Sequence, residues 1–439
     1  MQMASTSVSA SAFRGYVRDL RNLNSHALSM GGLPLTTVDL AHQHLDGRAG
    51  RELRAAVDIG ELRRLGAFFT GNALAARVVG LAPDPSGWDA VYDPACGCGD
   101  LLLAAAEQLP ILGDLNDTLH SWGELIYGQD LVPEFVEVTR QRLMLLALLR
   151  GSRPTTEVGR LDLLLPGIRV GDGRVADTLS RASLVLVNPP YGQVRAPQAC
   201  SFGSGRVSEA ALWIDGLIDQ LPDRAQLIAV LPDVLRSGSR YAHMRRSVGE
   251  RGNIYEVESQ GRFDALTDVD VFLLRFQRCS QPSRPWPSPS QPFGSTLADR
   301  CRVQVGTVVD RRDPHEGPFV PYVTAQSLPL GGEVEPTWER QFGGRLFDPP
   351  FVVVRRTSRP TSTRSRMHPV TITGHRAVAV ENHLIVVTPL RPRLSSCRAI
   401  SRVLRRPDTT EWLNTRIRCR HLTVAAIREL PIGDSMNSI

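Results

Sequence analysis

The sequence of 439 residues contains no lysine, so all 51 basic residues are arginines. This absence excludes the phosphate-binding loop of NTPases, which ends in Gly-Lys-Ser/Thr. It also excludes nuclease sites that rely on lysine, so any restriction activity is expected on another chain. The formal net charge is nevertheless +6. The planar fork of arginine suits phosphate oxygens and guanine edges, which is compatible with a nucleic-acid partner, although codon bias in a GC-rich genome is the simpler explanation.

Long apolar runs and paired cysteines are lacking as well. No run approaches the ~20 residues of a membrane-spanning helix. The N-terminal sequence MQMASTSVSASAF has no basic start followed by an apolar core, so it does not predict a secretory signal. Seven cysteines without paired spacing indicate reduced thiols. We therefore expect a soluble, cytoplasmic protein with no membrane partner and no metal site.

Changes in composition and hydrophobic pattern along the sequence predict four regions. Between residues 61 and 278, short β-branched apolar runs alternate with amphipathic helical stretches, which indicates a mostly parallel sheet covered on both faces. Residues 279–292 are rich in proline and serine, as is typical of a linker. We expect an N-terminal helical extension (1–60), an α/β domain (61–278), a linker (279–295) and an α+β domain (296–439). The clearest expected elements are strands at 90–92, 124–127, 183–187, 226–231, 269–276, 351–355 and 383–388, and helices at 48–65 and 409–418.

A glycine turn follows the first of these strands. The sequence Asp-Pro-Ala-Cys-Gly-Cys-Gly spans residues 93–99 and precedes a helical run. Gly97 and Gly99 allow the backbone to turn tightly and to approach a ligand, with the N-terminus of the next helix aimed at it. The three-glycine fingerprint of dinucleotide-binding enzymes is absent. The acid Asp93, followed by proline and small residues, instead fits a cofactor with an amino-acid tail.

Two further acids end strand-like runs. Asp130 is placed to accept both ribose hydroxyls of a nucleoside. Asp172 ends the run from residue 168 and is placed to accept a hydrogen bond from an adenine amino group. Asp162 is an alternative for this last role, and the sequence does not decide between them. Carboxylates at the ends of successive strands would converge at one edge of the sheet.

The strongest single feature is Asn188-Pro189-Pro190-Tyr191, directly after the apolar strand 183–187. An aromatic amine is a poor nucleophile, because its lone pair is delocalised into the ring. If the Asn188 side-chain oxygen and the Pro189 carbonyl accept hydrogen bonds from such an amine, they stabilise the charge that develops on nitrogen without a strong base. The prolines remove backbone donors and fix the turn. Tyr191 offers a face on which a planar substrate stacks.

These residues carry a resemblance to the gamma class of N6-adenine DNA methyltransferases of restriction–modification systems. Residues 93–99 resemble motif I, residues 188–191 motif IV, residues 66–71 (Gly-Ala-Phe-Phe-Thr-Gly) motif X, and residues 230–235 motif VI. The usual Thr-Pro of motif X is Thr70-Gly71 here. The order of the motifs, followed by a recognition domain, is similar to that class. The resemblance covers residues 66–276.

The resemblance implies a doubly wound, Rossmann-like sheet that binds S-adenosylmethionine and methylates the N6 amino group of adenine in duplex DNA after base flipping. It implies catalytic roles for the tetrapeptide and a second stacking face at Phe263. The implied cofactor-binding residues are Thr70, Asp93, Pro94, Ala95, Cys96, Gly97, Gly99, Asp130, Leu131 and Asp172.

Residues 296–439 resemble, more loosely, the target-recognition domains of such enzymes and of type I specificity subunits. Arginines gather around a Ser/Thr-rich segment at residues 357–364, and arginine with hydroxyl donors suits phosphate contacts. We expect duplex DNA as the substrate and a separate restriction or defence subunit as a further partner. The arginines of this cluster are Arg355, Arg356, Arg359, Arg364 and Arg366. We expect the first three to bind DNA.

Two other functions share some of these features. Asn-Pro-Pro-Tyr also resembles the motif of methyltransferases that act on the glutamine amide of release factors and on guanine amines of ribosomal RNA, so an RNA or protein-glutamine N-methyltransferase is the alternative enzyme. A DNA-binding subunit with a degenerate methyltransferase fold is the non-enzymatic alternative. The sequence leaves open the DNA recognition site, the oligomeric state, the biological setting and the role of residues 1–60.

Overall fold

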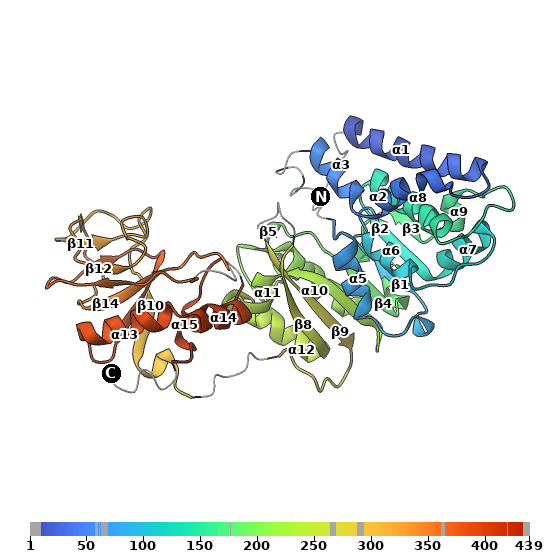
Figure 1. Ribbon diagram of the computed structural model, residues 1–439. Helices are drawn as coiled ribbons and strands as arrows, with labels where there is room; N and C mark the ends of the chain where they lie inside the picture. Colours follow the sequence, from blue (N-terminus) through green and yellow to red (C-terminus); the bar gives the residue numbers. More distant parts are fainter. Residues whose placement is uncertain are drawn as a thin grey trace. The chain divides into compact units, whose positions relative to one another are not determined.

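The computed structural model describes residues 10–57, 60, 62, 69–175, 177–263, 269–287, 294–360, 365–418 and 420–432. The chain forms two compact units (Figure 1). Unit 1 comprises Met1–Leu235 and His243–Pro287, and unit 2 comprises Arg236–Ala242 and Ser288–Ile439. Within the described ranges, none of the helices has the length and apolar character needed to cross a membrane. The six cysteines in these ranges are free thiols.

Unit 1 is built on a seven-stranded sheet with the order β3-β2-β1-β4-β7-β9-β8. The first five strands of this order are parallel, β9 is antiparallel to β7, and β8 is antiparallel to β9. The order reverses direction between β1 and β4, which is the topological switch point of a doubly wound sheet. The expected α/β fold is confirmed. The strands are β1 (Val91–Asp93), β2 (Ile126–Asp130), β3 (Ile168–Val170), β4 (Leu184–Val187), β7 (Gln226–Pro232), β8 (Gly252–Arg262) and β9 (Asp270–Arg278).

Helices cover the sheet on both faces. Every residue of β1 and β4 is buried, and successive side chains of a strand point to opposite faces, so neither face is open to solvent there. The main core contains Trp122, Ile126 and Leu186. The helices are α5 (Asn72–Gly80), α6 (Asp100–Ala106), α7 (Leu115–Leu125), α8 (Pro133–Leu149), α9 (Leu161–Leu164), α10 (Glu209–Gln220), α11 (Asp233–Ser237) and α12 (Ala242–Arg251).

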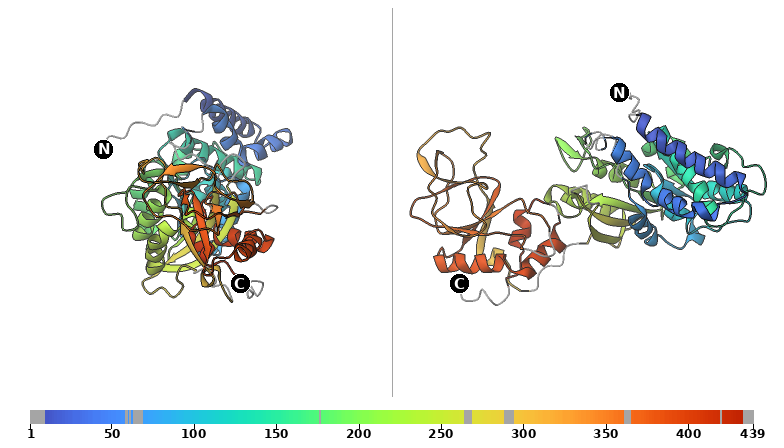
Figure 2. Two further views of the ribbon diagram at one scale, coloured as in Figure 1. Left: turned by 90° about the vertical axis from the view of Figure 1, so that its left-hand side faces the viewer. Right: turned by 45° about the horizontal axis from the view of Figure 1, so that its top comes forward.

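The N-terminal extension packs on the α/β fold. It consists of α1 (Ala10–Ser29), α2 (Val38–Leu45) and α3 (Arg48–Ala56), and α1 lies against α8 (Figure 2). Helical spacing places Phe13, Tyr16 and Leu20 on one face of α1, where they are buried together with Phe135 of α8. The helix expected at 48–65 is confirmed as far as residue 56, and much of the remainder lies outside the described residues.

Unit 2 contains a five-stranded sheet of order β10-β17-β14-β15-β12 and a three-stranded sheet of order β13-β11-β16. The strands expected at 351–355 and 383–388 are confirmed as β14 (Phe351–Arg355) and β17 (Leu384–Pro389). The helix expected at 409–418 is α14 (Pro407–Arg416). The other elements are β10 (Cys301–Val305), β11 (Phe319–Val323), β12 (Gly332–Val334), β13 (Glu339–Gln341), β15 (Val370–Ile372), β16 (Ala379–Val380), α13 (Leu394–Leu404) and α15 (Val424–Arg428).

The first part of the expected linker is attached to unit 1. The Asn253 side-chain oxygen accepts hydrogen bonds from the backbone of Ser283 (2.8 Å) and Arg284 (3.0 Å). The guanidinium of Arg284 lies over the ring of Tyr255, 4.8 Å from its centroid. Proline-rich sequence is thus held by one asparagine and one aromatic ring, and the remainder of the expected linker at 288–293 lies outside the described residues.

Candidate active site

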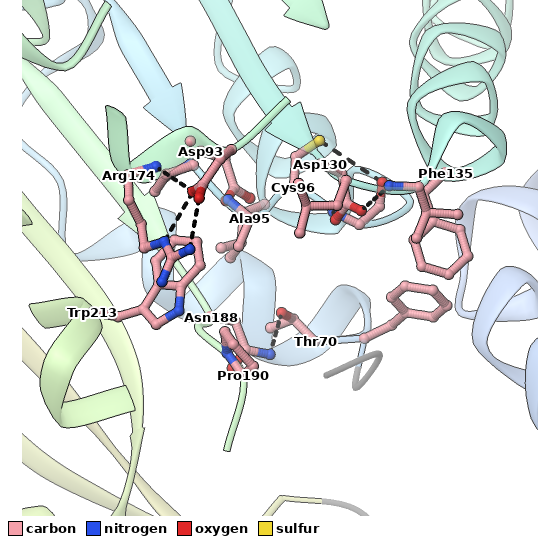
Figure 3. Close-up of a pocket in the computed structure, with 18 of the residues that line it drawn as sticks. Thr70, Asp93, Ala95, Cys96, Asp130, Phe135, Arg174, Asn188, Pro190 and Trp213 are labelled. Carbon is pink, nitrogen blue, oxygen red and sulfur yellow. Dashed lines mark hydrogen bonds and ion pairs between the residues drawn. The ribbon is translucent and has the colours of Figure 1, made fainter. Parts of the chain in front are cut away.

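Four of the residues singled out in the sequence lie at the carboxyl ends of adjacent parallel strands. Asp93 and Asp130 are the last residues of β1 and β2, Asp172 follows β3, and Asn188 follows β4. All four line one pocket with roughly 1090 Å³ of empty space, part of it open to solvent (Figure 3). In doubly wound sheets, ligands bind at this edge beside the switch point, here between β1 and β4. The structure therefore brings these four side chains together at one edge of the sheet.

The turn after β1 has the shape that its glycines allow. Gly97 and Gly99 have φ of +52° and +85°, which L-residues with a side chain rarely adopt. A Cβ on Gly97 would lie 3.0 Å from the ring of Phe69, and one on Gly99 would lie 2.7 Å from the Thr139 methyl group. Thr139 Oγ1 also donates a hydrogen bond to the Gly97 carbonyl (3.0 Å). Gly97 lines the pocket, whereas Gly99 is the N-cap of α6 and is not among the lining residues.

The two acids nearest the switch point are Asp93, which is buried, and Asp130, which is partly buried. The pKa of Asp93 is raised to about 8, mainly because the side chain is buried. A hydrogen bond from the Ala95 amide lowers this pKa, whereas the negative charges of Asp130 and Asp100 raise it. Burial also raises the pKa of Asp130, whose oxygens accept hydrogen bonds from Gly97 N (3.0 Å) and Val132 N (2.9 Å). A cationic group in the pocket would relieve this repulsion and favour both ionised carboxylates.

The structure separates the two candidates for the third acid. Asp172 lines the pocket, and both of its oxygens pair with Arg174, at 2.9 Å (Nε) and 2.6 Å (Nη2). These hydrogen bonds lower its pKa, so the carboxylate stays ionised. A carboxylate has about four lone-pair sites, so pairing with arginine leaves room for another donor. Asp162 lies on α9, pairs with Arg160 and does not line the pocket.

One wall of the pocket was not anticipated from the sequence. Arg174 stacks on Trp213 of α10, with the guanidinium carbon 5.3 Å from the ring centroid. Glu209 and Trp213 are four residues apart, so they share one face of α10. Burial raises the pKa of Glu209, and the positive charge of Arg174 partly offsets this rise. The only feature of the sequence that indicates this wall is the four-residue spacing of Glu209 and Trp213 in α10. The other unanticipated lining residues are Phe69, Asp100, Leu101, Val132, Phe135, Gly171 and Gly173.

The tetrapeptide contacts the expected motif X. The Asn188 amide nitrogen donates a hydrogen bond to Thr70 Oγ1 (3.1 Å), which turns the amide oxygen away from Thr70 (Figure 3). Asn188 and Pro190 line the pocket, and Pro189 is buried beside it. Thr70 therefore positions Asn188 as well as lining the pocket. Residues 66–68 of motif X lie outside the described residues.

Tyr191 and Phe263 form an aromatic pair outside the lining of this pocket. Their ring centroids are 5.8 Å apart and the planes meet at 76°. The Tyr191 hydroxyl donates to the Val230 carbonyl (3.2 Å), and burial raises the pKa of Tyr191 well above 10. The two side chains are therefore neighbours, and both also pack against the main core. Because they meet edge to face, a planar base can stack on both only after one ring turns.

A buried arginine joins the N-terminal extension to the glycine turn. Arg142 of α8 is fully buried and pairs with Asp100 (2.8 Å), which also accepts a hydrogen bond from Gly71 N (2.8 Å). The same guanidinium donates to the Cys98 carbonyl and to the carbonyls of His44 (3.0 Å) and Leu45 (2.9 Å) at the end of α2. The N-terminal helices are therefore attached to the pocket through Arg142.

The arginines of unit 2 are used differently from one another. Arg355 donates to the carbonyls of Ala325 (3.0 Å), Leu328 and Pro329 (3.2 Å). Arg356 donates to the Asn382 carbonyl (3.1 Å). These bonds stabilise the fold of unit 2.

Arg359 is exposed and lines a small polar pocket together with Arg355. Arg366 is buried in the wall of this pocket, where it donates to Ser358 Oγ (3.0 Å). Arg364 lies outside the described residues. Of the three arginines predicted to bind DNA, Arg359 is exposed, whereas Arg355 and Arg356 are partly buried.

Comparisons with known proteins agree with the fold and the motifs. The family model for N-6 DNA Methylase matches residues 60–201, a stretch that contains both the glycine turn and Asn-Pro-Pro-Tyr. This match confirms the resemblance to N-6 DNA methylases drawn from the motifs. No curated protein matches the sequence.

Among solved structures, the Type IIL restriction-modification enzyme MmeI in complex with DNA matches with a TM-score of 0.51 and 11% identity, over 87% of this chain and 70% of that chain. This likeness shows the fold. The M protein of the type I restriction enzyme EcoKI matches at 16% identity with a TM-score of 0.37, over 61% of this chain and 63% of that chain. The methyltransferase subunit of a type I restriction-modification system from Streptococcus thermophilus matches at 18% identity with a TM-score of 0.35, over 52% of each chain. The match therefore spans about half to two thirds of those two subunits.

Proposed function

We propose that this protein is a cytoplasmic, S-adenosylmethionine-dependent methyltransferase that modifies the N6 amino group of adenine at a specific sequence in duplex DNA. The observation that carries the proposal is the convergence of Asn188 with Asp93, Asp130 and Asp172 in one pocket at the switch point of the sheet. The match of the N-6 DNA Methylase family model to the same stretch supports the DNA substrate.

The pocket fits S-adenosylmethionine, which when bound supplies an activated methyl group. The buried Asp93 carboxylate lies close to the charge of the partly buried Asp130, which raises its pKa and favours a cationic ligand such as this sulfonium. In our proposal Asp93 binds the amino-acid tail together with Thr70, and Asp130 binds the ribose hydroxyls. Asp172 accepts a hydrogen bond from the amino group of the cofactor's adenine. Leu131, which is 52% exposed at the rim of the pocket, contacts the face of the same adenine. The backbone from Pro94 to Gly97 lies against the ligand.

Catalysis in this proposal depends on hydrogen-bond acceptors and not on a general base. The Asn188 side-chain oxygen and the Pro189 carbonyl accept hydrogen bonds from the target amine and stabilise the positive charge that develops on its nitrogen. The hydrogen bond to Thr70 restricts rotation of the Asn188 amide, so that its oxygen is oriented before the amine arrives. The two prolines of the turn fix the backbone and remove competing donors.

The target adenine must leave the helical stack to reach this pocket, because its amino group is inaccessible in a duplex. Tyr191 and Phe263 provide aromatic surface for the extruded base. We assign DNA recognition to unit 2, with Arg359 as a phosphate contact. The MmeI structure, which is a complex with DNA, supports a DNA-bound arrangement of this fold, and the type I subunits support a separate restriction partner.

The proposal is tested by incubating the protein with labelled S-adenosylmethionine and three acceptors: unmethylated genomic DNA, ribosomal RNA and release factor. We expect label in DNA alone. Asn188→Ala should reduce transfer by about 10²–10³-fold, as for loss of one preorganised polar contact at a reacting centre, while the Kd for the cofactor stays within error. Transfer to RNA or protein, or an Asn188→Ala variant with normal activity, would overturn the proposal.

A further inference from the structure

A two-stranded ribbon begins two residues after Tyr191. It consists of β5 (Gln193–Arg195) and β6 (Arg206–Ser208), which pair antiparallel. At its base the Gly192 carbonyl accepts a hydrogen bond from Glu209 N (2.9 Å), the first residue of α10. A Cβ on Gly192 would lie 2.5 Å from the Glu209 carboxylate, so a side chain at position 192 would displace that carboxylate. The ribbon is therefore attached firmly between the tetrapeptide and the helix that carries Trp213.

The ribbon has one apolar and one basic face. Val194 pairs with Val207, which is completely buried. The neighbouring pair, Arg195 with Arg206, points to the opposite face, because successive residues of a strand alternate. Both arginines are exposed. Residues 192–208 contain these two arginines and no acidic residue, so the outer face of the ribbon carries only positive charge.

The two arginines are directly opposite each other, and like charges in this position destabilise a strand pair. Arg206 donates to the backbone carbonyl of Gln193 (2.5 Å), and among the described residues neither arginine has an acidic partner. The protein thus keeps an unfavourable charge pair beside the tetrapeptide. A bound anion between the guanidinium groups would relieve that repulsion.

We propose that the outer face of the β5–β6 ribbon binds backbone phosphates of duplex DNA next to the extruded adenine. This inference rests on the proposed function. A two-stranded ribbon is narrow enough to enter the major groove or follow its edge. Because the ribbon starts immediately after Tyr191, phosphates held by Arg195 and Arg206 belong to the part of the duplex that delivers the base. The contacts are to phosphate, so they position the DNA and do not read its sequence.

The substitution Arg195→Glu separates this role from a structural one. It places a carboxylate opposite Arg206 and replaces a repulsive pair by an attractive one, so the melting temperature of the protein should stay equal or rise. Binding to genomic DNA fragments should nevertheless weaken by at least about tenfold at about 0.1 M salt, because one phosphate contact is lost and a repulsive charge is added. A residue with only a structural role would not move stability and DNA affinity in opposite directions.

The double variant Arg195→Ala/Arg206→Ala tests how many DNA phosphates the ribbon contacts. The slope of log affinity against log salt should become shallower by about 1.8, since each contact contributes about 0.9. The matched control is Arg14→Ala/Arg18→Ala, which removes two exposed arginines that lie four residues apart on α1. It should leave the slope unchanged.

An unchanged slope for the ribbon variant, or an equal change in the control, would overturn the inference. Either result would leave the proposed function intact if the wild-type protein methylates DNA. Failure of the wild-type protein to bind or methylate DNA would instead overturn the proposed function.

Discussion

The pocket of unit 1 and the arginine cluster of unit 2 were predicted by the same kind of argument, but the structure treats them differently. Asp93, Asp130 and Asn188 meet in one pocket as expected. In the arginine cluster, Arg355 and Arg356 donate to backbone carbonyls of their own unit, and Arg359 remains exposed. A residue at the carboxyl end of a parallel strand has its position fixed by the sheet. An arginine does not, because its five donors bind a backbone carbonyl as readily as a phosphate.

The largest effect that we expect within this comparison comes from Arg142, the buried arginine of unit 1. Arg142→Ala leaves the Asp100 carboxylate buried without its partner and removes hydrogen bonds to three carbonyls. Breaking a buried ion pair on one side costs about 3–5 kcal/mol, so the free energy of unfolding of unit 1 should fall by about that amount in chemical denaturation. Arg150→Ala, which also removes hydrogen bonds from α8 to backbone carbonyls but no ion pair, is the control and should cost less. Equal losses would show that the ion pair is not what holds the extension.

The second effect is the pH dependence of cofactor binding through Asp93. Its pKa of about 8 lies above the ordinary value of 3.8 because the side chain is buried. The folded protein thus holds a proton that the unfolded chain has lost, and its stability should fall as the pH rises from about 4 to about 8. Binding of a cationic cofactor needs the ionised form, so its affinity should rise up to about tenfold per pH unit until about pH 8.

Calorimetric titration with S-adenosylmethionine between about pH 6 and pH 9 measures this profile. Asp93→Asn should bind more weakly and give a flat profile over the same range, because its side chain does not titrate. A wild-type affinity that is independent of pH would show that Asp93 does not meet the charged part of the cofactor. It would weaken the view that buried carboxylates define the unit 1 pocket.

The third effect separates two arginines of the same cluster. Arg355→Ala should lower the free energy of unfolding of unit 2 by about 1–3 kcal/mol, because the partly buried carbonyls of Ala325 and Leu328 lose their donor. Arg359→Ala should leave stability unchanged and make the salt slope of DNA binding shallower by about 0.9. Thermal unfolding and DNA titration of both variants make the comparison. If Arg355→Ala weakened DNA binding without loss of stability, the distinction drawn between the two arginines would be wrong.

Much of the pocket could be predicted from the sequence, because its residues follow local rules. Gly97 and Gly99 adopt positive φ, Asp93 and Asp130 are the last residues of their strands, and Asn188 directly follows β4. The choice between Asp172 and Asp162 could not be made from the sequence, which left both as candidates for the same role. The structure shows a short helix, α9, around Asp162 and places Asp172 in the pocket.

Residues supplied by other elements could not be predicted. Trp213 and Arg174 meet only because α10 packs across the loop after β3, and no local pattern encodes that packing. The attachment of the N-terminal helices to the site could not be predicted for the same reason. It depends on Arg142, which contacts His44 across 98 residues of sequence. Local rules therefore identify the edge of the sheet, whereas the walls of the site depend on tertiary packing.

The central claim is that the pocket of unit 1 methylates adenine in DNA, and the most direct test is to map the modified bases. Unmethylated genomic DNA is incubated with the protein and S-adenosylmethionine, and modified positions are identified by long-read sequencing. We predict N6-methyladenine at one short sequence, absent from DNA treated with Asn188→Ala. Methylation of cytosine, or no DNA methylation by a protein that binds the cofactor, would contradict the account.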